Sequence, residues 1–176
     1  MTANNHPLLP QYWTELEKAI NLYKQKGTDP QTIRAYEKLV ETTRTINDPI
    51  LFYQPLRGLG TILLERNNEK NDTTDLEKAK KYFAEGIKFA DKGGRPFERV
   101  DLRMCLGRTV FQLNEDWQLM YHNYVEAASI AKKADLKELL REAEDMIRVI
   151  KSEHPLEIQQ LAGDKAGKYT PTNKAI

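Results

Sequence analysis

Residues 83–92, FAEGIKFADK, are matched without a gap by residues 124–133, YVEAASIAKK. Aromatic, acidic, small, alanine and lysine positions coincide, and the apolar residues recur at the spacing of one face of an α-helix. A second pattern precedes each copy: Leu59-Gly60 followed by Leu63, and Leu106-Gly107 followed by Val110. The two stretches predict that one two-helix unit occurs at least twice in this chain.

The same periodicity extends on both sides of these segments. Asp29-Pro30 and Asp48-Pro49 each have the form of an N-cap followed by proline in the first helical position, where the missing N–H has no cost. No stretch alternates with period two for long enough to form a strand. The sequence therefore predicts an all-α fold with helices at residues 10–26, 30–46, 50–67, 74–92, 96–113, 115–134 and 136–152.

These patterns resemble the tetratricopeptide repeat (TPR), whose consensus runs W-x2-L-G-x2-Y, then A-x3-F. Trp13 and Leu16 supply W-x2-L once, the Leu-Gly pair occurs twice, and Ala79 with Phe83 supplies A-x3-F. The spacing between copies exceeds the 34 residues of the family. The resemblance implies antiparallel hairpins stacked as a short right-handed superhelix, with about three hairpins and residues 136–152 as a capping helix.

The domain organisation follows from the limits of this pattern. We expect an N-terminal arm at residues 1–9, the repeat domain at 10–152, and a polar, flexible tail at 153–176. A short apolar segment in the tail either docks back on the domain or serves as a linear motif. It contains Leu156, Ile158 and Leu161.

Composition excludes several classes of function. Lys and Arg number 27 against 26 Asp and Glu, so the basic excess of a typical nucleic-acid-binding protein is missing. No run reaches the roughly 20 apolar residues of a membrane span, and the first ten residues do not form a signal peptide, so we expect a cytoplasmic protein. Cys105, the only cysteine, falls in an apolar stripe and is expected to be a buried structural thiol.

Residues with catalytic potential do not gather in the sequence. His6, His122 and His154 are scattered, and no phosphate-binding, nucleotide-binding, zinc-protease or serine-hydrolase motif occurs. We therefore predict no enzyme activity, no cofactor and no metal. Arg95, Arg99 and Arg103 share one helix face, which is interpreted as salt-bridged with Glu98 and Asp101, or alternatively as a contact for an anion.

The TPR resemblance also implies which residues line a groove. In that family the concave wall is built from the first helix of each hairpin, at positions set relative to the Leu-Gly pair. Arg57 and Arg108 would then bind a carboxylate, with Leu64, Met104 and Phe111 as apolar contacts. Counted from Gly60 and from Gly107, the predicted wall consists of Gln54, Arg57, Thr61 and Leu64, and of Asp101, Met104, Arg108 and Phe111.

The function predicted from these features is a protein- or peptide-binding module, such as an adaptor, chaperone or assembly factor. The alternative is a regulatory sensor of a small anionic ligand or a short peptide, and an all-α enzyme ranks last. Dimerisation of two copies through exposed apolar helix faces is a further alternative.

Overall fold

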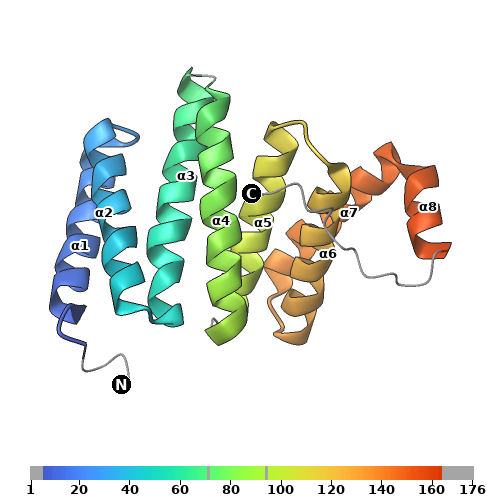
Figure 1. The fold of residues 1–176 in the computed structure, drawn as a ribbon. Coiled ribbons are helices and arrows are strands. Elements are labelled where there is room, and N and C mark those ends of the chain that lie inside the picture. Colours follow the sequence, from blue (N-terminus) through green and yellow to red (C-terminus); the bar gives the residue numbers. More distant parts are fainter. Residues whose placement is uncertain (1–5, 71, 94, 164–176) are drawn as a thin grey trace.

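The computed structural model describes residues 6–70, 72–93 and 95–163. Within these residues the chain is helical and contains no strand, which confirms the all-α prediction. Figure 1 shows the helices standing side by side in chain order, with successive helices antiparallel. They are α1 (Leu9–Lys26), α2 (Pro30–Ile46), the 3-10 helix η2 (Pro49–Phe52), α3 (Tyr53–Lys70), α4 (Thr73–Gly93), α5 (Pro96–Gln112), α6 (Trp117–Lys133), α7 (Lys137–Glu153) and α8 (Pro155–Gly163).

Two aspartates begin helices as the sequence predicts. The Asp29 carboxylate accepts a hydrogen bond from the Gln31 N–H at 2.8 Å, and the Asp48 carboxylate accepts one from the Ile50 N–H at 2.9 Å. The second cap starts a 3-10 turn rather than the predicted helix over 50–67, and α3 begins only at Tyr53. Pro55 fits the first turn of α3 because the N–H that it lacks would have no partner there.

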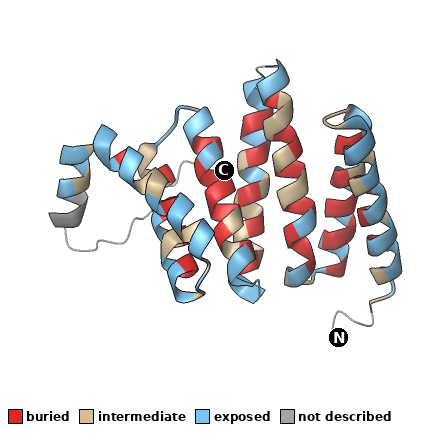
Figure 2. Cartoon of the chain, turned by 180° about the vertical axis from the view of Figure 1, so that it is seen from behind, coloured by how far each residue is buried: buried red, intermediate tan, exposed pale blue. Residues whose placement is uncertain are grey.

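The hydrophobic core runs through the whole array, because each helix from α1 to α7 packs against the next. Figure 2 shows that buried positions lie where neighbouring helices face each other. The largest fully buried side chains include Tyr12, Phe52, Phe83 and Tyr124. In the described part of the chain, no helix combines the length and the hydropathy that a membrane crossing needs.

The glycines of the two Leu-Gly pairs permit close helix contacts. A Cβ on Gly60 would lie 2.5 Å from the Phe83 ring, and a Cβ on Gly107 would lie 2.7 Å from the Tyr124 ring. Gly58 meets the Tyr36 ring of α2 in the same way, with 2.3 Å from the added Cβ. Residues 58 and 60 differ by about 200° around the helix axis. α3 is therefore packed closely on two opposite sides, against α2 and against α4.

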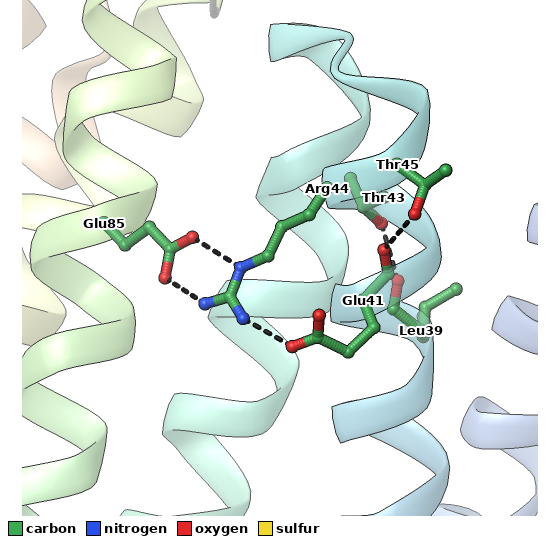
Figure 3. A network of polar contacts seen from close by, with 6 residues as sticks. All are labelled: Leu39, Glu41, Thr43, Arg44, Thr45 and Glu85. Carbon is green, nitrogen blue, oxygen red and sulfur yellow. Dashed lines mark hydrogen bonds and ion pairs between the residues drawn. The ribbon is translucent and has the colours of Figure 1, made fainter.

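Ion pairs also connect helices that are not adjacent in sequence. Arg44 of α2 reaches Glu85 of α4 with two hydrogen bonds of 3.1 and 2.7 Å, and it also contacts Glu41 at 2.5 Å (Figure 3). On the same turn, the Thr43 and Thr45 hydroxyls donate to the carbonyl oxygens of residues 39 and 41. This cluster joins the second helices of two consecutive hairpins.

The C-terminal part of the described chain differs from the predicted tail. Pro155 ends α7 but also starts α8, since proline suits the first position of a helix. Ile158 is partly buried and packs against the core, while Leu156 is 69% exposed. Among the described side chains of the apolar segment, that of Ile158 thus contacts the domain. The rest of the predicted tail, residues 164–176, lies outside the described residues, as do residues 1–5 of the predicted arm.

Candidate partner-binding face

The exposed side of α3 carries a continuous stripe of solvent-facing residues, and that of α5 carries one that the buried residues 102–107 interrupt. Both helices are largely buried by their neighbours, and many of the positions that reach solvent are spaced three or four residues apart. We refer to these stripes together as the A face. It consists of Gln54, Arg57, Thr61 and Leu64 on α3 and of Phe97, Asp101, Arg108 and Phe111 on α5.

Seven of the eight predicted wall residues lie on the A face. Gln54, Arg108 and Phe111 are exposed, and the others are half-buried. Met104 is the exception: only 2% of it is exposed, and its side chain belongs to the hydrophobic core. The helical position of Met104 fits the stripe, but its long unbranched side chain fills the space between helices instead. A partner on the A face cannot contact Met104 in this structure.

Arg57 is paired with a carboxylate of the protein itself. Its Nε donates to Asp101 Oδ2 at 3.2 Å, and the Tyr53 hydroxyl donates to the same oxygen at 3.1 Å. Burial and then the negative charge of Asp101 raise the pKa of the Tyr53 phenol, so that it remains a donor at neutral pH. The three residues form a polar link from α3 to α5.

Arg108 has a corresponding partner on α7. Its guanidinium forms a charge-assisted hydrogen bond with Glu142, and both side chains are about half exposed, at 52% and 46%. Exposed ion pairs of this kind contribute little to stability, about 0–1 kcal/mol. Glu142 was not among the predicted wall residues. Nothing local in the sequence indicates its pairing with Arg108, since the two residues come from different helices.

Two aromatic rings lie at the ends of the α5 stripe. Phe97 is 47% exposed and Phe111 is 57% exposed. With a rise of 1.5 Å per residue, the two positions are about 21 Å apart along the helix axis. Phe97 also meets Tyr53 edge-on, with ring centroids 6.3 Å apart. The sequence interpretation did not include Phe97, although a step of four residues back from Asp101 leads to it.

The arginine stripe near the start of α5 is salt-bridged. Arg99 and Arg103 both bond to Asp91 on α4, and Arg95 bonds to Glu98. These contacts confirm that the face is salt-bridged. The partner of Arg99 and Arg103 is Asp91, however, and not Asp101. Asp101 bonds to Arg57 instead.

The remaining groups with chemical potential are few. Cys105 is buried, as predicted, and burial raises the pKa of its thiol to about 12. Among the described residues, no three His, Cys, Asp or Glu side chains lie close enough together to hold a metal ion. Comparisons with protein-family models, curated proteins and solved structures find no significant match to this chain.

Proposed function

We propose that this chain is a TPR-like helical-repeat module that binds a protein or peptide partner on the A face. Two observations support a TPR-like array. Gly60 receives the Phe83 ring and Gly107 receives the Tyr124 ring, so the Leu-Gly pairs serve the close packing of hairpins that the family pattern implies. The first helices α3, α5 and α7 also contact one another in succession.

The exposure of Phe97 and Phe111 is the observation that carries the binding proposal. A phenyl ring that is half exposed on a rigid helix loses contact with water when a partner covers it. Each ring is worth about 1.5–3 kcal/mol when fully buried. Aromatic residues are also enriched in the energetic centres of protein interfaces.

The polar residues between the rings suit the same role. Arg57–Asp101 and Arg108–Glu142 place both signs of charge along the stripe, which favours a partner with a defined order of charges. An extended peptide rises about 3.3 Å per residue, so about six residues span the distance between the two rings. The partner that fits best is a short peptide segment with an apolar side chain near each end.

A displayed random-peptide library, selected on the purified protein, tests this function directly. Selected peptides are measured by calorimetry against wild type and against the double variant Phe97→Ala/Phe111→Ala. We expect the double variant to bind at least about ten-fold more weakly, because roughly 1.4 kcal/mol corresponds to a factor of ten.

Ile50 provides a matched control, since it is 60% exposed and lies on η2 outside the A face. Ile50→Ala is expected to leave the affinity unchanged. Peptides that bind the double variant as tightly as wild type would place the binding site elsewhere on the protein.

A further inference from the structure

The Tyr124 hydroxyl donates no hydrogen bond to an acceptor among the described residues. Tyr124 is fully buried, and its ring lies against Gly107, with its Cζ atom 3.0 Å from an added Cβ. A buried hydroxyl without a partner is unfavourable, and most buried polar groups in proteins have one. The presence of this hydroxyl therefore needs a physical explanation.

The preceding hairpin shows that packing does not require the hydroxyl. There, Phe83 occupies the equivalent position over Gly60 and is also fully buried. A second polar difference accompanies it: Thr61 follows Gly60, whereas Arg108 follows Gly107. At this point of the repeat, the third hairpin thus carries a phenol and a guanidinium where the second hairpin carries a phenyl ring and a threonine side chain.

The buried hydroxyl and the Arg108 guanidinium influence one another electrostatically. Burial raises the pKa of the Tyr124 hydroxyl to about 12, whereas the positive charge of Arg108 and a weak contact with its guanidinium act to lower it, and Glu142 acts with the opposite sign to Arg108. The hydroxyl therefore remains protonated at neutral pH and is a donor. Beside it, Arg108 is bonded to Glu142, whose carboxylate is about half exposed. An exposed pair of this kind contributes little to stability, so its replacement by a pair with another carboxylate has a small cost.

We propose that Arg108 and the Tyr124 hydroxyl form a carboxylate-binding site that Glu142 closes in the free protein. A carboxylate of the partner displaces Glu142, accepts hydrogen bonds from the Arg108 guanidinium and accepts the hydrogen bond that the Tyr124 hydroxyl does not make at present. This inference rests on the proposed function, because Arg108 belongs to the A face. It identifies the partner as a peptide with an acidic group near Phe111, one turn beyond Arg108 on α5.

The test measures binding of acetate to the whole protein by NMR, with chloride at equal ionic strength as the reference. The Nε–Hε signal of Arg108 and the ring signals of Tyr124 report the site. Glu142→Gln removes the competing charge, and we expect saturable binding of acetate at least about five-fold tighter than in wild type. Glu144→Gln is the matched control, since it removes the same charge from an exposed position of the same helix.

Tyr124→Phe in the Glu142→Gln background isolates the hydroxyl. Loss of a hydrogen bond to a charged acceptor is expected to weaken acetate binding by about ten-fold. Phe83 shows that a phenyl ring fits such a position, so the variant is expected to fold with an unchanged or higher melting temperature. Equal acetate affinity with and without the hydroxyl would contradict the proposed carboxylate site. So would an increase in acetate affinity from Glu144→Gln as large as that from Glu142→Gln.

The peptides selected on the A face separate this inference from the proposed function. Replacement of their acidic residue by its amide is expected to weaken binding to wild type, and to have no effect on binding to Arg108→Gln. Peptides whose affinity depends on Phe97 and Phe111 but does not change with the amide replacement would refute the carboxylate site. The proposed binding function would still hold in that case. A carboxylate that binds only as free acetate would likewise contradict the peptide partner.

Discussion

Gly60→Ala tests the packing on which the hairpin depends. The added methyl group would lie 2.5 Å from two atoms of the Phe83 ring, whereas carbon atoms in contact are normally about 3.5–4.0 Å apart. The ring cannot move toward solvent, because Phe83 is fully buried. α3 and α4 must therefore move apart, or the ring must leave its preferred rotamer.

The magnitude follows from two opposing contributions. Overpacking of a buried site costs about 1–3 kcal/mol, and a contact this short belongs at the upper end of that range. Alanine in a helix interior regains about 1 kcal/mol relative to glycine. The net loss in the free energy of unfolding is therefore about 2 kcal/mol. For a domain of this size, it corresponds to a decrease in melting temperature of about 4–8 °C.

Urea unfolding followed by circular dichroism measures the loss. Gly93→Ala is the matched control, because the same methyl group at the end of α4 would meet only an ordinary contact of 3.5 Å with Pro49. Phe83→Leu makes room for the methyl group. In that background Gly60→Ala should cost at least about 1 kcal/mol less than in wild type. A Gly60→Ala protein as stable as Gly93→Ala, or a penalty independent of residue 83, would show that the close approach does not hold the hairpin.

Three further changes have outcomes set by other parts of the structure. Arg66→Ala leaves the buried Asp75 carboxylate without its cation and should lower the free energy of unfolding, measured in urea, by about 3 kcal/mol. Asp75→Asn, added to the same variant, should recover part of this loss, because it removes the unpaired charge. Cys105 should react with a thiol reagent at pH 8 only after unfolding, because burial raises its pKa to about 12; rapid modification of the native protein would contradict its burial. Burial acts to raise the pKa of Glu15, but hydrogen bonds, first that from Lys38, outweigh it and lower the pKa. The Glu15 carboxylate therefore stabilises the fold at neutral pH and loses this effect as the pH falls through the pKa of the folded state, so that the stability difference between wild type and Glu15→Gln should shrink in acid.

The helices could be predicted because their signals are local. The apolar periodicity and the Asp29 and Asp48 caps lie within a few residues of the structures they specify. Two elements were missed for physical reasons. The turn at residues 49–52 depends on contacts with α3 and α4 as well as on its own residues, and α8 is too short to show a helical period clearly.

The A face was predicted in outline but not in its pairing. Helix geometry alone puts positions three or four residues apart on one side of α3 and of α5. For this reason seven of the predicted wall residues lie on the A face. The pairs Arg57–Asp101 and Arg108–Glu142 depend on how far α5 stands from α3 and from α7. Met104 was misplaced because its burial is set by the same interhelical distances.

The position of the Arg108–Glu142 pair has a consequence for the array as a whole. It is a polar link between α5 and α7, and a partner carboxylate that displaces Glu142 would break it. α7 would remain in place through Ala143 and Ile150, which are fully buried in the core. Binding at this site would therefore exchange an exposed ion pair for a hydrogen-bonded ligand without loss of apolar packing. The fold can accept such an exchange because its stability resides in the contacts beneath the A face, while the charges on the face remain free to change partners.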